Sequence, residues 1–189
     1  FVMREAMKQQ KRWSEKYGRF VVSCNVSYQQ FLVDGYVDRI DATARALGVD
    51  PSCMIIELTE SCSVQAPEVL ADIFERLRSC GFRIALDDFG TGYASLDMLK
   101  KLPADGIKIE HNFVRELEKD SNHVNLAIIR SIVNLCEELG LHVIIEGVEN
   151  AGVESVIRHL NVGYLQGYYY SKPVNRRCFE ALLEENRRV

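Results

Sequence analysis

Short apolar runs alternate with amphipathic helical stretches along the whole of this 189-residue chain. The runs are apolar at successive positions rather than at every second one, which is typical of strands covered on both faces. We expect strands at 20–26, 53–58, 82–86, 106–109, 142–145 and 162–170, and helices at 1–13, 28–47, 67–81, 96–102, 121–140, 153–160 and 177–184. This alternation predicts an α/β fold built on a parallel sheet.

The number of expected strands leaves two architectures open. A (β/α)8 barrel typically needs about 250 residues, whereas this chain supplies six strands in 189 residues. The sheet is therefore either an incomplete barrel or an open, doubly wound sheet. No linker, low-complexity tract or internal repeat indicates a second domain. The chain begins within a helical pattern and no capping residue comes first, which favours a domain that starts upstream of Phe1.

The composition argues against some classes of function and indicates a cellular compartment. The formal net charge of −4 argues against a protein that neutralises many phosphates of a nucleic acid polymer. No apolar run reaches the roughly 20 residues of a membrane helix. The six cysteines are dispersed, without a C-x-x-C pair and with mostly apolar neighbours. They are typical of reduced core residues, which favours a cytoplasmic location.

Polar side chains gather where the expected strands end. In both candidate folds, functional groups are expected at the C-terminal ends of the parallel strands. Burying an ionisable group is costly unless the group is paired or binds a metal, so polar residues at several strand ends favour one shared site. The residues at these positions are Asn25, Glu57, Asp87, Asp88, Lys108, Glu146 and Gln166.

The chemistry of this set favours hard divalent cations. It contains carboxylates, amides and a lysine, with no convincing histidine or cysteine ligand. Oxygen ligands favour Mg²⁺ or Mn²⁺ over Zn²⁺. Adjacent Asp87 and Asp88 suit two ions, because one carboxylate can bridge both ions while its neighbour binds the second. Since a pair of ions roughly 3.5–4 Å apart is the usual arrangement for hydrolysing phosphodiesters, this is the leading reaction class.

Each of these residues has a simpler interpretation when it is taken alone. A lone strand-end aspartate such as Asp88 is more often a helix cap or a turn former. Lys108 alone would more often be a surface or salt-bridged lysine, and the glycine-rich segment 89–93 alone would be a tight turn. Their joint occurrence in strand order favours the functional interpretation.

One segment closely resembles a known family signature. LDDFGTGYASL at 86–96 is nearly identical to the D-D-F-G-T-G-Y-S-S-L motif of the EAL domains, which hydrolyse cyclic di-GMP to a linear dinucleotide. Other segments agree in order: SCNVS at 23–27, ELTES at 57–61, DGIKI at 105–109, EGVE at 146–149, QGY at 166–168 and SKP at 171–173. The resemblance covers essentially the whole chain. It implies a TIM-like (β/α)8 barrel of EAL type, incomplete here with about six of its eight strands.

The resemblance implies a two-metal site and assigns its ligands. Asn25, Glu57 and Asp87 are expected to bind a first divalent cation, Mg²⁺ or Mn²⁺. Asp87 is expected to bridge to a second cation, which Asp88 and Glu146 also bind.

The resemblance also implies catalytic and loop residues. Lys108 is expected to position or deprotonate the attacking water, with Gln166 beside it. A lysine that acts as a base needs a lowered pKa, which two nearby cations could produce. Glu60 is expected to connect the loop 88–96 to the metal site. In the family this loop borders a dimer interface, and here it contains Gly90, Thr91, Gly92 and Tyr93.

The chain departs from the family pattern in three places. The strand that carries the Glu-Ala-Leu motif, whose glutamate is a ligand of the first metal, is absent. The usual Asp-Arg-Ser after Lys108 is EHN at 110–112, and Ile145 replaces an alanine. We therefore expect residues 1–189 to be an N-terminally truncated EAL domain that hydrolyses little alone, with two long strand edges exposed.

The resemblance leaves other functions open. The parent protein is expected to be a phosphodiesterase and a homodimer, with a sensory or diguanylate cyclase domain upstream. One alternative is a catalytically silent module that senses cyclic di-GMP or contacts a protein. Another is an unrelated phosphate-binding barrel enzyme that uses the glycine loop as an anion cradle, but no basic cluster lies near that loop.

Overall fold

A computed structural model describes residues 1–59, 67–90, 96–119 and 123–186. These residues form a six-stranded sheet in which each strand pairs in parallel with the next one along the chain. The strands are β1 (Val22–Asn25), β2 (Met54–Thr59), β3 (Arg83–Phe89), β4 (Gly106–Ile109), β5 (His142–Ile145) and β6 (Tyr164–Leu165). A doubly wound sheet reverses its strand order at a switch point, and this sheet does not. The incomplete barrel is therefore the correct alternative.

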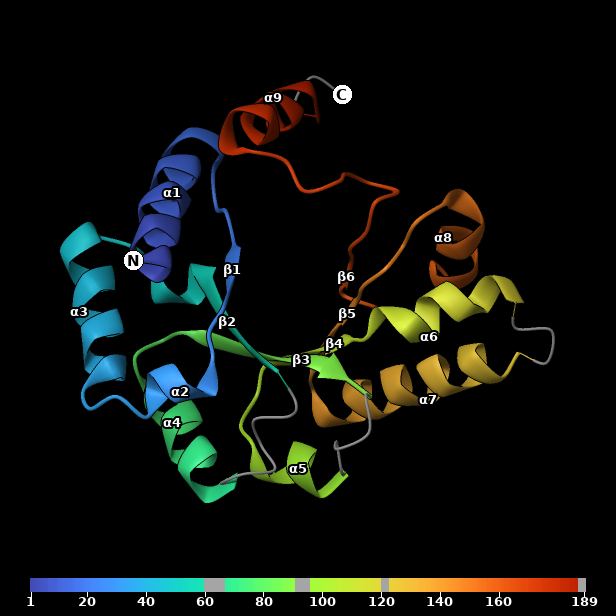
Figure 1. Ribbon diagram of the computed structural model, residues 1–189, viewed down its shortest axis with the longest axis horizontal. Coiled ribbons are helices and arrows are strands. Elements are labelled where there is room, and N and C mark those ends of the chain that lie inside the picture. The colour runs from blue at the N-terminus through green and yellow to red at the C-terminus, as the bar shows by residue number, and fades with distance from the viewer. Residues whose placement is uncertain (60–66, 91–95, 120–122, 187–189) are drawn as a thin grey trace.

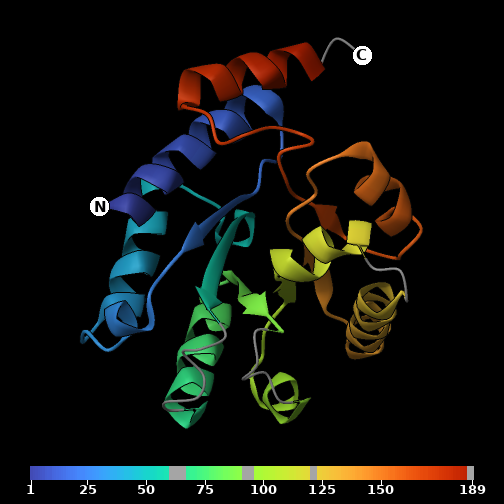
Figure 2. The same ribbon diagram turned by 45° about the vertical axis from the view of Figure 1, so that its right-hand side comes forward.

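Helices surround the outer face of the curved sheet, as in the ring around a TIM barrel (Figures 1 and 2). The helices of the described residues are α1 (Val2–Tyr17), α2 (Tyr28–Phe31), α3 (Tyr36–Leu47), α4 (Pro67–Ser79), α5 (Leu96–Lys101), α6 (His111–Arg115), α7 (Val124–Leu139), α8 (Ala151–Ile157) and α9 (Arg176–Asn186). The described residues also include the short 3₁₀ helices η1 (Pro51–Cys53) and η3 (Glu116–Lys119). Among the described residues, no helix combines the length and the apolar character needed to cross a membrane.

The core lies between the sheet and these helices, and α4 shows how the sequence builds it. Leu70, Phe74 and Leu77 recur at helical spacing and are almost wholly buried. Burying each of them stabilises the fold by about 1.5–3 kcal/mol. The helix is followed by Gly81 at φ +91°, a conformation that only glycine adopts without strain. The strand that follows is thereby directed back into the sheet.

Two predicted elements differ in the structure. The expected helix 28–47 is divided into α2 and α3 because Gly35 adopts φ +67° between them. The expected strand 162–170 is wrong beyond residue 165, since β6 has only two residues. Tyrosines favour strands, but here the backbone turns after Gly167, and Tyr170 N donates a hydrogen bond to the Gly167 carbonyl.

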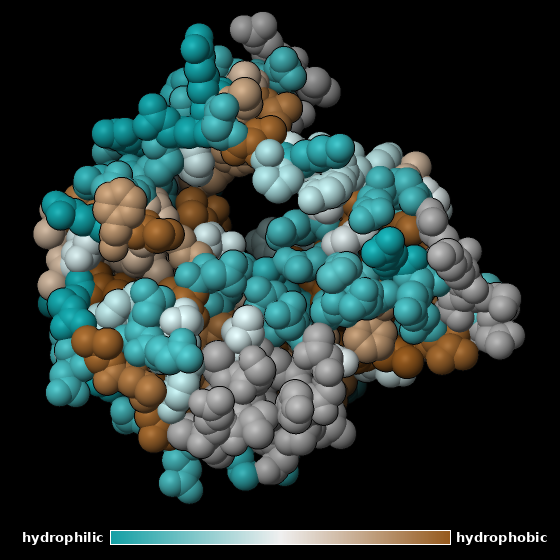
Figure 3. Space-filling model, in the orientation of Figure 1, coloured by the Kyte–Doolittle hydropathy of each residue, from teal (hydrophilic) through white to brown (hydrophobic). Residues whose placement is uncertain are grey.

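The sheet has two free edges, β1 and β6. These edges have four and two residues, so the long exposed edges expected from the sequence are in fact short. A cleft of about 720 Å³ lies beside them, with Trp13, Ser23, Gln166 and Phe179 in its lining. The hollow is visible between the two sides of the molecule in Figure 3. Across one side of the cleft α9 packs on α1, where the Trp13 and Phe179 rings lie 5.0 Å apart.

Candidate active site

Three predicted site residues meet around the ammonium group of a fourth, Lys108. Its Nζ lies 2.7 Å from Glu146 Oε1, 2.9 Å from Glu57 Oε2 and 3.1 Å from Asp87 Oδ1. Lys108 and Glu57 are 4% exposed and Asp87 is 8% exposed. With all groups ionised, three carboxylates and one ammonium leave this buried cluster with a formal charge of −2. Such a cluster attracts further positive charge.

The neighbouring carboxylates control the charge of Lys108. Burial disfavours the ammonium form, but hydrogen bonds to Glu146 and Glu57 and the charge of Asp87 outweigh burial and raise the pKa of Lys108 above its usual value. A lysine that acts as a base needs a lowered pKa. In the metal-free protein the side chain is instead a cation and a hydrogen-bond donor.

Strand register brings these residues together. Asp87 lies opposite Thr59 in the parallel ladder, and Thr59 faces the same side of β2 as Glu57 two residues earlier. Leu86 lies opposite Ile107, so the next residues, Asp87 and Lys108, also share a side. Side chains from three adjacent strands thus project from one face of the sheet at its C-terminal end.

The end of β3 is irregular at the predicted second metal ligand. Asp88 has a positive φ of 57°, which is uncommon for a residue other than glycine, and the ladder register shifts between Leu86 and Phe89. The Asp88 amide donates a hydrogen bond to Asp87 Oδ1 at 3.0 Å. Bulges of this kind redirect side chains at the rims of barrels. The sequence placed both aspartates after the strand, whereas the structure includes them in it.

Asn25 and Gln166 lie at the two ends of the row of strands. Asn25 is the last residue of β1 and lies opposite Glu57 in the ladder. Gln166 follows β6 and lines a pocket that also contains Glu146. Neither amide has a hydrogen bond to the Lys108 cluster among the described residues.

The loop predictions can be placed only in part. Gly90 has φ +104°, and a Cβ at this position would lie 2.6 Å from the ring of Phe113, so only glycine fits there. The contact therefore limits how closely the chain at Gly90 approaches α6. Glu60 and the loop residues Thr91, Gly92 and Tyr93 lie outside the described residues.

The oxygen atoms of the cluster suit a divalent cation, but the Lys108 ammonium lies at its centre. Its ligand atoms are carboxylate oxygens, which Mg²⁺ and Mn²⁺ prefer. Within the described parts of the chain, no three His, Cys, Asp or Glu side chains are arranged to hold one ion. The position between the carboxylates is taken by the Lys108 ammonium. An ion bound there would have to displace this group.

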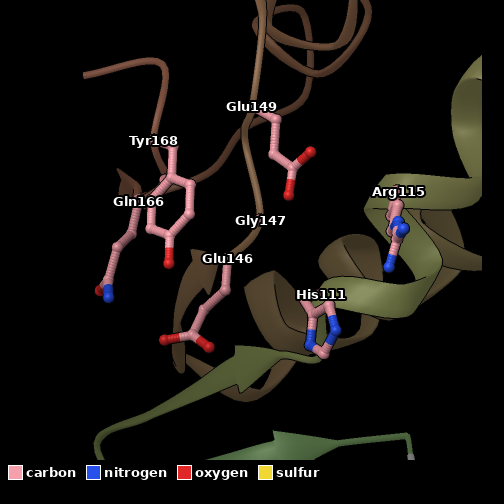
Figure 4. Close-up of a pocket in the computed structure, with 8 residues that line it drawn as sticks. His111, Arg115, Glu146, Gly147, Glu149, Gln166 and Tyr168 are labelled. Atoms are coloured by element: carbon pink, nitrogen blue, oxygen red, sulfur yellow. The ribbon is translucent and has the colours of Figure 1, made fainter. Parts of the chain in front are cut away.

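A pocket of about 360 Å³ adjoins the cluster through Glu146 (Figure 4). One wall is α6, which supplies His111 and Arg115, and the opposite wall includes Glu149 and Tyr168. The helix at 111–115 and a role for Arg115 were not predicted from the sequence. The segment 110–112, which differs from the family pattern, could have indicated this helix. Glu110 caps α6 by accepting a hydrogen bond from the Asn112 amide.

Relatives of this chain act on cyclic di-GMP. It is 35% identical over 175 residues to the bifunctional diguanylate cyclase/cyclic di-GMP phosphodiesterase MucR of Pseudomonas aeruginosa, covering 92% of this chain and 25% of that protein. It is 31% identical over 180 residues to the cyclic di-GMP phosphodiesterase PdeR of Escherichia coli, and the match covers 95% of this chain and 27% of that protein. The chain thus spans about a quarter of the length of these curated relatives.

Solved structures share the fold and support the same family. The MucR phosphodiesterase in complex with cyclic di-GMP superposes with a TM-score of 0.87 at 34% identity, covering 94% of this chain and 72% of that one. A manganese and cyclic di-GMP complex of Klebsiella pneumoniae BlrP1 gives a TM-score of 0.77 at 26% identity, and the match covers 91% of this chain and 44% of that one. The EAL domain family model matches residues 1–173. With this match and these relatives, the chain belongs to the EAL domain family.

Proposed function

We propose that this chain is the larger part of a metal-dependent phosphodiesterase domain that hydrolyses cyclic di-GMP to the linear dinucleotide. The observation that carries the proposal is the cluster in which Glu57, Asp87 and Glu146 surround one buried cation, Lys108. Three carboxylates from separate segments, placed around a positive charge, are the kind of arrangement that a cation-dependent hydrolase requires. The relatives named as cyclic di-GMP phosphodiesterases indicate the substrate.

The proposed ligands of two Mg²⁺ or Mn²⁺ ions are Asn25, Glu57, Asp87, Asp88 and Glu146. When bound, the ions would supply an activated water and would stabilise the attacking and leaving oxygens of the phosphodiester. The BlrP1 complex with manganese favours such a metal.

The protein side chains would position the substrate and the water. Lys108 is held as a cation among the carboxylates, and once an ion takes its place between them it would donate hydrogen bonds toward the attacking water or a phosphate oxygen. Gln166 would orient the same water from the end of β6. We propose that Glu60, Gly90, Thr91, Gly92 and Tyr93 form the loop that supports this site.

We also propose that a further strand segment completes the domain. β1 and β6 each pair on one side only, and the cleft between them adjoins Gln166. A strand pair placed there would close the barrel and could add one more carboxylate to the cluster. The chain alone would then bind metal weakly and turn over little substrate.

Turnover of cyclic di-GMP with Mg²⁺ or Mn²⁺ tests this proposal in two proteins, the 189-residue chain and a version extended upstream. We expect rapid hydrolysis by the extended protein only, and a loss of at least about 100-fold for Glu146→Gln. Glu138→Gln is the matched control, because Glu138 is exposed on α7, on another part of the surface. No turnover by the extended protein would refute the phosphodiesterase. Equal, rapid turnover by both proteins would refute the need for an upstream carboxylate.

One observation favours a second candidate, a silent cyclic di-GMP sensor. Lys108 occupies the centre of the carboxylate cluster, and no three-residue metal group is assembled among the described residues. If the extended protein is a sensor, it would bind cyclic di-GMP in EDTA. The ligand recovered from it would still be cyclic di-GMP, even after a metal is added. An active enzyme would release the linear product once a metal is added.

Assembly and location belong to the same proposal. We propose a homodimer, a sensory or diguanylate cyclase domain upstream, and a cytoplasmic location. The cyclase named in MucR supports the second of these proposals. Free cysteines at Cys24, Cys53 and Cys136 in the core favour a reducing compartment. Light scattering of the extended protein would test the dimer.

A further inference from the structure

The segment after β5 and the segment after β6 touch backbone to backbone at Gly167. A Cβ on Gly167 would lie 2.1 Å from the Val148 carbonyl oxygen and 2.4 Å from the Val148 nitrogen. These are the shortest such distances at any described glycine. Because Cβ atoms essentially never lie within 3.0 Å of another heavy atom, only a residue without a side chain fits at this position.

Hydrogen bonds on both sides of this contact join the same two segments. The ladder between β5 and β6 ends with Ile145 opposite Leu165. Beyond it, the Val148 amide donates a hydrogen bond to the Gln166 carbonyl at 3.1 Å, and the Tyr169 amide donates one to the Val148 carbonyl at 2.9 Å. The two segments therefore continue as one backbone unit past the end of the sheet.

The two sides of this unit are held to different degrees. Val148 is fully buried, and Glu146 just before it contacts Lys108 Nζ on β4 at 2.7 Å. The other side follows β6, which has only two residues and lies at an edge of the sheet. An atom inserted at Gly167 would therefore displace the chain around Gln166 and leave Val148 and Glu146 in place.

The position of the Gln166 side chain depends on this backbone unit. Its amide and the Glu146 carboxylate extend in the same direction from the two joined segments and line one pocket (Figure 4). Among the described residues, the Gln166 amide makes no hydrogen bond to the Lys108 cluster. The backbone thus decides where the amide lies relative to Glu146.

From these observations we propose that Gly167 is a positioning residue, because the contact that its missing side chain permits holds the Gln166 amide beside Glu146, where it orients the attacking water. This inference rests on the proposed function and adds to it the feature of the chain that places Gln166. Precise placement matters, since a shift of about 1 Å in a positioning group can reduce a rate by about 100-fold.

A double-mutant cycle for the turnover of cyclic di-GMP with Mn²⁺ by the upstream-extended protein tests the inference. Gly167→Ala should lower kcat by about 100-fold when Gln166 is present. In Gln166→Ala the same change should lower kcat by less than about 3-fold, because no amide is left to misplace. A glycine that only stabilises the fold would cause the same factor in both backgrounds.

Equal factors in the two backgrounds would overturn the positioning role and leave the phosphodiesterase intact. No turnover by wild type would overturn the proposed function together with the inference. The matched control is Gly163→Ala, because Gly163 lies just before β6 whereas Gln166 follows it, and a Cβ at Gly163 would also approach β5, 3.3 Å from the Val143 carbonyl oxygen. This variant should keep the wild-type kcat.

A crystal structure of Gly167→Ala gives a measurement that is independent of turnover. Gln166 should be displaced relative to Glu146 while Val148 stays in place, and an unmoved Gln166 would overturn the inference. If Gly167→Ala does not fold, an ester in place of the Tyr169 amide removes the hydrogen bond to the Val148 carbonyl without adding bulk. It should lower kcat by about 3- to 10-fold when Gln166 is present and not in Gln166→Ala; an unchanged kcat would overturn the inference.

Discussion

Replacing Lys108 with methionine removes the cation at the centre of the cluster while keeping an unbranched side chain that is one atom shorter. Glu57, Asp87 and Glu146 would then face one another without their common partner, which lies 2.7–3.1 Å from each of them. Removing one member of a buried ion pair costs about 3–5 kcal/mol, since the remaining charge stays buried and unpaired. For a protein of this size each kcal/mol lowers Tm by about 2–4 °C, so we expect a loss of roughly 6–20 °C in EDTA.

Thermal unfolding with and without Mn²⁺ measures this loss of Tm and also how much the metal stabilises each protein. A divalent cation would take the place of the ammonium, so Mn²⁺ should raise Tm more in Lys108→Met than in wild type. The control is Lys100→Met, since Lys100 is exposed on α5 and should change Tm little. The reasoning fails if Lys108→Met is as stable as wild type in EDTA. It also fails if Mn²⁺ stabilises the variant no more than wild type.

Three further predictions follow from features outside the cluster. Gly147→Ala should destabilise the protein by about 1–3 kcal/mol, because alanine at φ +79° is strained; urea unfolding at wild-type stability would contradict this. Burial raises the pKa of Cys136 from 9.0 to about 11, so its stabilising contribution is complete below pH 9 and is lost as the pH rises toward 11. Wild type should lose stability over this range relative to Cys136→Ala, and in the native state at pH 8 a thiol reagent should modify exposed Cys178 but not Cys136. Phe179→Ala should shift the emission of Trp13, the only tryptophan, to longer wavelength, because their rings lie 5.0 Å apart; an unchanged spectrum would show that α9 does not cover α1 in solution.

The sequence predicted the elements that depend on a local pattern of residues. The strands 106–109 and 142–145 have the predicted bounds, because each is a short apolar run next to a glycine or a strand-end polar residue. The convergence of Glu57, Asp87, Lys108 and Glu146 also followed from local information, since the C-terminal ends of neighbouring parallel strands share one edge.

Other features depend on tertiary contacts that no local pattern reports. Glu57, Asp87 and Glu146 come from three separate segments and together hold Lys108 as a cation, whereas the prediction from the sequence included only the effect of metals on its pKa. The five-residue α6 is too short for a periodic signal, and so Arg115 escaped notice. The final strand ended early because the backbone around Gly167 bonds to Val148, so that Tyr168 and Tyr169 lie outside the ladder.

Anomalous scattering from crystals grown with Mn²⁺ and cyclic di-GMP tests the central claim most directly. The account predicts manganese peaks about 2.0–2.6 Å from carboxylate oxygens of Glu57, Asp87 and Glu146, with Lys108 Nζ moved from its place between them. A crystal that contains bound cyclic di-GMP but no manganese at these carboxylates, with Lys108 still paired to all three, would contradict it.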